Sequence, residues 1–198
     1  MKNKKENKKE NKRIEIALKA YNLHLKEGVS GFSLNGLLKT ISMSKGNFYH
    51  YFKNQDDLYY EIINVIFGSF LERFVEPQKA KTFEEKLHKL FFIYVSELQE
   101  VQDYMVFIYE IYPFFSNSKN QFTYNFMQEY YIYLFSELKK VMEEGIREGT
   151  LKSEILTMIK PIAAVADGIY THSCMLKDYN RPHEMKKYIK FISEHYGT

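Results

Sequence analysis

A group of polar, aromatic and basic residues between positions 44 and 53 is the part of the sequence best equipped to bind another molecule. Phe48 and Phe52 are four residues apart, so on a helix both rings lie on one face and can anchor it to a core. At about 100° per residue, the opposite side then presents hydrogen-bonding groups and positive charge, with no carboxylate. Such side chains can pair with phosphates and with base edges in the major groove of DNA. The residues on that side and its flanks are Lys45, Gly46, Asn47, Tyr49, His50, Tyr51 and Lys53.

A preceding helical segment must hold this candidate helix in place. Positions 34–41 carry leucine or isoleucine at i, i+3, i+4 and i+7, which is the apolar face of a short helix. Ser33 and Ser44 stand just before the two segments, and each hydroxyl can cap a helix by accepting a free backbone N–H. Residues 42–44 interrupt the apolar period. The pattern predicts a helix-turn-helix over 33–53, whose second helix can enter the major groove.

The same stretch strongly resembles the helix-turn-helix of the TetR (tetracycline repressor) family of bacterial regulators. The residues that carry the resemblance are Ser44-Lys45-Gly46-Asn47-Phe48-Tyr49-His50-Tyr51-Phe52-Lys53, followed by Asp56, Asp57 and Leu58. The likeness is sharp from residue 10 to residue 65, and beyond that it concerns only length and helix content. The sequence departs from the family pattern at Leu38 and Ile41, where small residues are usual, at Ser42, where glycine is usual, and at Gln55, where a phosphate-contacting lysine is common.

The resemblance implies that Ser33 and Ser44 join the residues of the candidate helix in contacting DNA. Position on the helix suggests Asn47 and His50 as base readers, although the family pattern also allows His50 to contact phosphate. The flanking side chains would contact phosphates or base edges, and a glycine at position 46 lets the backbone approach a phosphate. The alternative is an ordinary surface helix with no partner.

The chain outside this segment also reads as helical, because no pair of alternating strands joined by a hairpin turn is present. Apolar residues from position 14 to 25 predict a first helix that ends at Gly28, and Arg13 at its exposed start could touch backbone phosphate. Residues 1–9 are lysine, asparagine and glutamate repeats that predict a disordered basic arm, either a DNA contact or a solubilising tail. Asn54 can cap a long helix that runs to Pro77.

Five further helices are expected in the second part of the chain. The patterns place them over 82–98, 102–112, 119–147, 157–175 and 181–192, with a loop over 114–120. Thr82 and Glu85 have capping-box spacing, Pro113 should stop a helix, and Thr157 can cap one. The predicted fold class is all-α, with a three-helix head on a helical body and about nine helices in all. The resemblance implies that this body binds a ligand and dimerises.

The body is rich in aromatic rings, and many of them are tyrosines whose hydroxyls need partners when buried. Glu110 and Asp167 lie in apolar helical runs, where a buried carboxylate must be paired or neutral. Each could meet a cationic ligand or simply pair with a neighbouring group at a dimer seam. The alternative for the rings is ordinary core packing. The resemblance to the TetR family implies a ligand pocket in this body, and the candidate pocket residues are Tyr94, Phe107, Glu110, Phe126, Tyr130 and Asp167.

Composition excludes several classes of protein. Residues 1–60 hold 12 lysines and arginines against 6 acidic residues, whereas the remainder holds 16 against 19, so a basic end is suited to a polyanion. A single cysteine excludes an internal disulfide, no run of 18 apolar residues could span a membrane, and no secretory signal is evident. His172 and Cys174 are two residues apart and do not share a helix face. With no catalytic motif, we expect no enzyme activity, no cofactor, no metal site and a cytoplasmic location.

These observations predict a DNA-binding regulator that works as a homodimer. Residues 1–53 would form the arm and DNA-binding domain, and residues 54–198 the effector-binding and dimerisation domain. The proposed partners are a palindromic double-stranded operator and a small hydrophobic or aromatic effector that releases a repressor from it. The alternative is a helical small-molecule or lipid-binding protein with no role at DNA.

Overall fold

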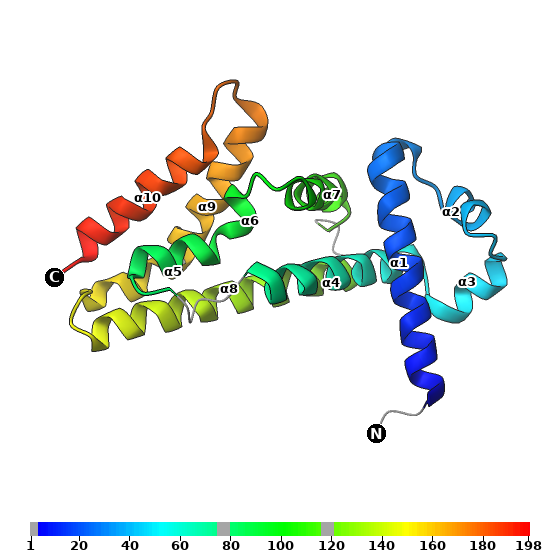
Figure 1. Cartoon of the computed structure of the whole chain (residues 1–198), viewed down its shortest axis with the longest axis horizontal. Helices are drawn as coiled ribbons and strands as arrows, with labels where there is room; N and C mark the ends of the chain where they lie inside the picture. The colour runs from blue at the N-terminus through cyan, green and yellow to red at the C-terminus, as the bar shows by residue number, and fades with distance from the viewer. Residues whose placement is uncertain (1–3, 75–79, 116–120) are drawn as a thin grey trace. The chain divides into compact units, whose positions relative to one another are not determined.

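The computed structural model describes residues 4–74, 80–115 and 121–198, and over these residues the chain is almost entirely helical (Figure 1). The described part holds ten α-helices, one 3-10 helix and one isolated antiparallel bridge between Leu151 and Gly197. The predicted all-α class is confirmed. The elements are α1 (Lys4–Gly31), α2 (Leu34–Thr40), α3 (Lys45–Tyr51), α4 (Gln55–Phe74), α5 (Phe83–Leu90), α6 (Phe92–Val95), α7 (Gln99–Phe115), α8 (Gln121–Arg147), η2 (Ser153–Met158), α9 (Ile159–Met175) and α10 (Arg181–Tyr196).

Helix α1 starts earlier and ends later than predicted. Residues 4–9 are helical, so the prediction of a disordered arm is wrong for them, and residues 1–3 lie outside the described residues. Lysine and glutamate are good helix formers, and the segment only has to extend a helix whose central part is held by buried residues such as Ile16. Gly28 has φ 69° and ψ 174°, which breaks the helical path where the end was predicted, but another turn follows to Gly31.

Helices α2 and α3 form the predicted helix-turn-helix, and both predicted caps are confirmed. The Oγ of Ser33 accepts the N–H of Gly36 at 3.1 Å, and the Oγ of Ser44 accepts the N–H of Asn47 at 3.2 Å. Between the helices, Ser42 has φ 52°, in the left-handed region that crowds the Cβ of an L-residue. The turn therefore needs this conformation at the position where the family pattern has glycine.

Replacing Ser42 by glycine is expected to stabilise the protein by about 0.5–1 kcal/mol, because relief of left-handed strain exceeds the added entropy of the unfolded chain. Chemical denaturation measures the change. The matched control is Ser136→Gly on α8, an exposed helical serine, where glycine should destabilise by a similar amount. A Ser42→Gly protein as destabilised as the control would contradict the strain argument.

Helix α4 begins as predicted. The Oδ1 of Asn54 accepts the N–H of Asp57 at 2.8 Å, and in return the Oδ2 of Asp57 accepts the N–H of Lys53 at 2.8 Å. These two bonds satisfy backbone donors on both sides of the helix start and fix how the chain leaves α3. Leu58 and Ile62 then point into the core, with at most 1% of their surface exposed.

The helix predicted over 82–98 is two helices. The capping box is confirmed, because Thr82 Oγ1 accepts the N–H of Glu85 at 3.1 Å and Glu85 accepts the N–H of Thr82 at 3.3 Å. At Phe91 the backbone turns to φ −92° and ψ 13°, so α5 ends and the short α6 follows. This break allows Phe91 and Tyr94 both to be buried.

Two predicted helix ends are wrong. Pro113 does not stop α7, which continues to Phe115, since a proline removes one N–H without ending every helix that contains it. Thr157 does not cap α9, because its hydroxyl donates to the Glu154 carbonyl at 2.8 Å inside η2. Of the predicted loop, residues 116–120 lie outside the described residues.

The last helices follow their predicted boundaries more closely. Helix α8 ends at Arg147, and Gly149 has φ 72° just beyond it. The segment 130–135, which has strand-like composition, is helical as predicted. Asn180 caps α10 by accepting the N–H of His183 at 3.0 Å, with a proline in the first turn.

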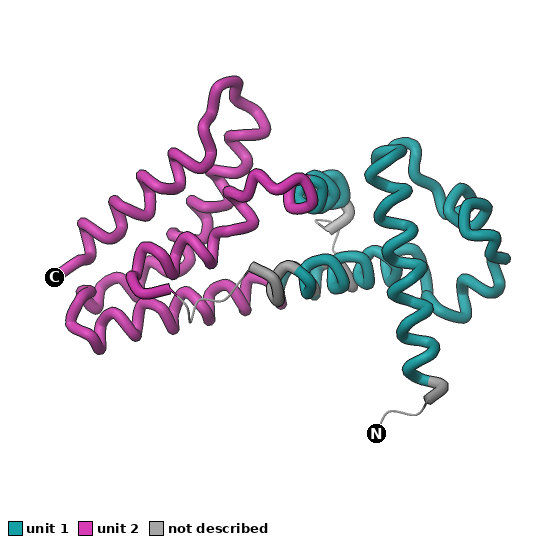
Figure 2. The backbone as a smooth tube through the Cα atoms, viewed as in Figure 1, with its two compact units in different colours: residues 1–70, 103–128 teal, residues 71–102, 129–198 magenta. Residues whose placement is uncertain are grey.

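The chain divides into two compact units, coloured in Figure 2. Unit 1 holds residues 1–70 and 103–128, and unit 2 holds residues 71–102 and 129–198. Unit 1 thus adds most of α4, most of α7 and the start of α8 to the predicted head, and the functional boundary at residue 53 stays a prediction. No helix in the described part of the chain is long and apolar enough to cross a membrane.

Candidate nucleic-acid interface

Two buried rings orient helix α3. Phe48 and Phe52 are both 0% exposed, and their rings stack with centroids 5.2 Å apart. The predicted anchor is therefore present. Because both rings occupy the inner face, the other side chains of the helix must face outward or sideways.

The outer side of α3 is exposed as predicted. The structure leaves exposed Ser33, Ser44, Lys45, Gly46, Asn47, Tyr49, His50 and Lys53, while Tyr51 is half-buried. The two serines accept backbone N–H groups as caps, which leaves their hydroxyl hydrogens able to donate. The residues predicted to bind DNA therefore lie on one short segment with their polar groups accessible.

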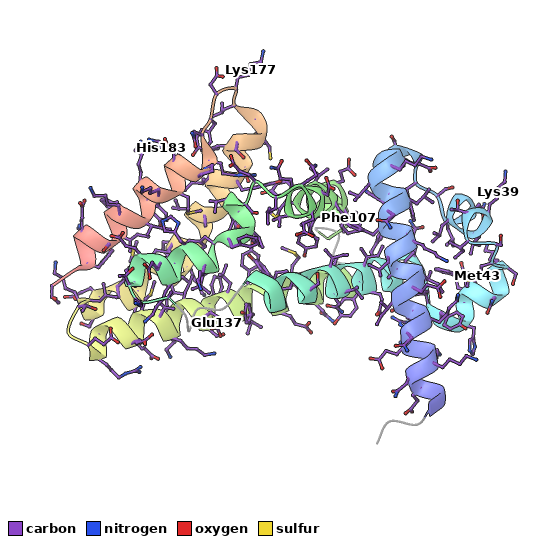
Figure 3. The ribbon with its side chains drawn as sticks, viewed as in Figure 1. Lys39, Met43, Phe107, Glu137, Lys177 and His183 are labelled. Atoms are coloured by element: carbon purple, nitrogen blue, oxygen red, sulfur yellow. The ribbon has the colours of Figure 1, made fainter. Side chains whose placement is uncertain are left out.

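The same surface carries positive charge and no carboxylate. The stretch 33–53 has no acidic residue, and Lys39, Lys45 and Lys53 are all exposed. Figure 3 shows Lys39 at the outer edge of α2, a cation that the sequence prediction did not single out. A surface of this kind attracts a polyanion without repelling it locally.

Arg13 on α1 joins three elements around the end of α3. Its guanidinium donates to Asp57 at 3.0 Å and to Glu61 at 2.7 Å, both on α4. It also donates to the carbonyl of Tyr51, the last residue of α3, and lies over the Phe52 ring at 4.5 Å. The hydrogen bonds of the Arg13 guanidinium therefore link the carboxyl end of α3 to α1 and α4.

The electrostatics of this arrangement favour an ionised Asp57. Burial alone would raise the pKa of Asp57, but hydrogen bonds from Arg13 and the Lys53 N–H, with the charges of both residues, hold it below its ordinary value. Burial likewise opposes the charge of Arg13, and its two carboxylate partners raise the pKa above the usual value. The ion pair is only slightly exposed, at 22% for Arg13 and 9% for Asp57.

The sequence prediction for Arg13 was wrong. Its place near the start of the first helix suggested a solvent-exposed side chain able to touch phosphate, whereas its charge is satisfied inside unit 1. The partners stand 44 and 48 positions away, so no helical period connects them. Only the packing of α1 against α4 brings them together.

Three of the candidate pocket residues, Phe107, Glu110 and Phe126, lie in unit 1, and the structure describes the side chains of the first two. The Nε2 of His24 on α1 is 2.9 Å from the Oε2 of Glu110 on α7, and the His24 side chain is fully buried. Phe107, labelled in Figure 3, is also fully buried, and its ring packs edge-on against Tyr21 at 5.3 Å and His24 at 4.9 Å. Glu110 is therefore the partner of a buried histidine that links α1 to α7.

Three other candidates meet in unit 2. The Tyr94 hydroxyl on α6 lies 2.6 Å from that of Tyr130 on α8. Tyr131, a residue not predicted, donates its hydroxyl to Asp167 on α9 at 2.8 Å. Burial raises the pKa of Asp167, and hydrogen bonds from Tyr94 and Tyr131 partly offset the rise. The side chain of Phe126 lies outside the described residues, so the six candidates are not brought to one place within a single unit.

Metal chemistry has no support in the described residues. Among them, no three His, Cys, Asp or Glu side chains gather closely enough to hold a metal ion. Cys174 is exposed near the end of α9. The expectation that His172 and Cys174 do not form a metal site stays a prediction.

Comparison with known proteins connects this fold with transcription regulators. A TetR transcription regulator from Haloarcula marismortui matches with a TM-score of 0.77, covering 95% of this chain and 100% of that chain at 18% identity. The reduced form of NemR from E. coli matches with a TM-score of 0.68, covering 92% of this chain and 96% of that chain at 16% identity. At these identities the likeness is one of fold.

Sequence comparison gives a shorter match. The chain is 33% identical over 70 residues to the HTH-type transcriptional regulator QacR of Staphylococcus aureus, which is 35% of this chain and 37% of that protein. No protein-family model matches the sequence.

Proposed function

We propose that this chain, which has the fold of the TetR family of transcriptional regulators, is a DNA-binding regulator. Its helix α3 would read an operator in the major groove. The observation that carries the proposal is the anchored α3: two fully buried rings turn a carboxylate-free, cationic side outward. A helix seven residues long offers few base contacts, so most of its affinity would come from phosphates.

A palindromic operator and a homodimer are part of the proposal. One recognition helix reads too few base pairs for useful specificity, whereas two copies spaced about 34–36 Å apart reach successive turns of one groove. Helices α9 and α10 expose apolar residues suited to association, with Val165 at 41% and Phe191 at 58% exposure. Ala164 is also exposed on α9 and permits close approach of a second helix.

We further propose that a small molecule bound to the body releases a repressor from DNA. Such an effector can act only by binding better to a conformation in which the paired heads do not fit the operator. The rival is a helical carrier of lipids or small molecules with no role at DNA. That rival does not require the exposed residues of α3, and we propose no catalytic role.

The direct test is gel retardation with DNA fragments flanking the protein's own gene. We expect retardation of a fragment bearing an inverted repeat, with two copies bound and an affinity that falls steeply as salt is raised. Analytical ultracentrifugation of the complex measures the number of copies. If every flanking fragment runs unretarded at low salt, the regulator proposal fails.

Replacing Tyr49 and Lys53 together by alanine is expected to weaken operator binding by roughly 10²–10³-fold, at about 1–3 kcal/mol for each lost contact. Both side chains are exposed, so the thermal midpoint should change little. Fluorescence anisotropy with a labelled operator measures the affinity.

The matched control replaces Tyr124 and Lys177 by alanine. Tyr124 is 49% exposed against 47% for Tyr49, and Lys177 is exposed in the turn after α9. This pair should leave operator affinity unchanged. Equal loss in both double variants, or no loss in either, would contradict the assignment of operator binding to the exposed side of α3.

A further inference from the structure

We propose that the effector is an organic cation, held by a cluster of Asp167 with Tyr94, Tyr130 and Tyr131, called here the tyrosine–aspartate cluster. The inference rests on the proposed function, since it names the chemical class of the small molecule that the body would bind. It is argued from the geometry and charge of unit 2 alone.

Three helices build the tyrosine–aspartate cluster. Tyr94 comes from α6, Tyr130 and Tyr131 from α8, and Asp167 from α9. Tyr131 donates to Asp167 at 2.8 Å, and Tyr94 lies close enough to hydrogen-bond to the same carboxylate. The Tyr130 and Tyr94 hydroxyls are 2.6 Å apart. When Tyr94 donates its hydrogen to Asp167, Tyr130 is the donor to Tyr94, so two hydroxyls donate to the carboxylate and the third supports one of them.

That negative charge has no cationic partner in the described part of the protein. Elsewhere such pairs are present: Arg13 meets Asp57 and Glu61, and Lys86 lies 2.7 Å from Glu144. Asp167 has only hydroxyl partners, although burial opposes its ionised form. Partial burial without a cationic neighbour favours either uptake of a proton or binding of a cation. The hydroxyl donors favour its ionised form, which is the form that a cation needs.

The surroundings suit a bulky ammonium better than a small metal ion. Tyr130 and Tyr131 have ring centroids 5.2 Å apart, and Tyr131 and Phe135 are 5.8 Å apart, so the hydroxyl that binds the carboxylate belongs to a group of neighbouring rings. Aromatic faces attract alkylated ammonium groups, whereas a calcium ion needs six or more oxygen ligands. The carboxylate already accepts hydrogen bonds from tyrosine hydroxyls. A quaternary ammonium, which has no N–H to donate, can therefore still pair with its charge.

The cluster is accessible enough for a ligand to reach it. Asp167, Tyr130 and Tyr131 are half-buried, whereas Tyr94 is buried behind them with 3% of its surface exposed. Burial and the nearby Tyr130 and Asp167 raise the pKa of Tyr94 well above its usual value, so it stays a neutral donor. A cation can therefore meet the carboxylate from the exposed side while Tyr94 supports it from within.

The test compares cations with an uncharged molecule of the same shape, by isothermal titration calorimetry on the full chain. Choline and benzyltrimethylammonium are the cationic probes, and 3,3-dimethylbutan-1-ol is the neutral counterpart of choline. We expect at least one cation to bind and the alcohol to give no heat of binding. Asp167→Asn should weaken cation binding at least tenfold, because an amide keeps the shape and removes the charge.

Two further variants separate a charge effect from a folding effect. Tyr131→Phe removes only one hydroxyl, so it should weaken binding of the same cation by a smaller factor than Asp167→Asn does. Asp178→Asn changes an exposed aspartate beyond α9 and should have no effect. Far-UV circular dichroism checks that each variant is folded.

The outcomes separate this inference from the proposed function. If neither cation binds, or if Asp167→Asn binds as tightly as the original chain, the organic-cation assignment is overturned while operator binding stands on its own measurement. If a cation binds through Asp167 but leaves an operator complex intact, the cation site stands and the release mechanism fails.

Discussion

Replacing Arg13 by methionine is expected to lower the free energy of unfolding by about 3 kcal/mol, since removing one partner of a buried ion pair strands the others. Methionine keeps much of the apolar stem of Arg13 but has none of its five donors, and the guanidinium over the Phe52 ring is lost. Asp57 and Glu61 would then lie at 9% and 17% exposure without their cation. Urea denaturation followed by circular dichroism measures the loss, and operator binding should weaken because the end of α3 is released.

The pH dependence of this loss identifies its cause. In the original chain the pKa of Asp57 is below its usual value, so its stabilising contribution is full above an unfolded pKa of about 4 and disappears as the pH falls through the lower folded value. Without Arg13, burial is the dominant influence on Asp57 and raises its pKa. Lowering the pH then protonates this carboxyl in the folded variant and removes the penalty of burying its charge, so the variant becomes more stable relative to the original chain. The stability gap between the two proteins should therefore narrow as the pH falls from 7 toward 4. A gap independent of pH would mean that packing, rather than charge, was lost.

Two controls accompany Arg13→Met. Arg13→Lys retains the positive charge but not the planar guanidinium with its five donors, so its free energy of unfolding should lie between those of the original chain and Arg13→Met. Lys139→Met breaks an exposed ion pair with Glu143, whose side chains are 59% and 43% exposed, and should cost less than about 1 kcal/mol.

Replacing Phe48 by alanine is expected to destabilise the protein by about 3–5 kcal/mol, because it removes a fully buried ring and leaves a cavity that the surrounding core fills only in part. The stack with Phe52 would be lost, and with it the orientation of α3. We expect a lower thermal midpoint by calorimetry and loss of operator binding at temperatures where the original chain still binds.

Tyr49→Ala on the same helix distinguishes a buried ring that anchors α3 from an exposed side chain that would contact DNA. Its ring is 47% exposed and touches Phe48 at its edge, so its removal should change stability by less than about 1 kcal/mol while weakening DNA binding. If Phe48→Ala proved as stable as Tyr49→Ala, the two rings would not be the anchor that the geometry suggests.

Much of the fold was predicted from helix caps and helical spacing, which depend only on residues close together in the sequence. Ser33, Ser44 and Asn54 are caps because their side chains need only reach a backbone N–H three residues away. Phe48 and Phe52 are predictable as an inner face because four residues make about one turn. The resemblance to TetR regulators is confirmed at the level of the fold, and the exposure of α3 agrees with its predicted outer side.

Features that depend on distant packing could not be read from the sequence. Arg13 looked like an exposed cation because Asp57 is 44 positions away. Tyr131 was not selected among many similar tyrosines, and only the approach of α9 to α8 gives it Asp167 as a partner. The split of the pocket candidates between two compact units has the same origin, because α7 and α8 each contribute residues to both units.

The exposed Cys174 at the end of α9 makes the natural sequence suitable for spectroscopy. Because it is the single cysteine, a nitroxide attached there places one unpaired electron on each chain with no residue replaced. Dipolar coupling between two such electrons arises only where two chains associate. One labelled sample therefore reports both whether pairs form and whether an operator or an organic cation changes the distance between them.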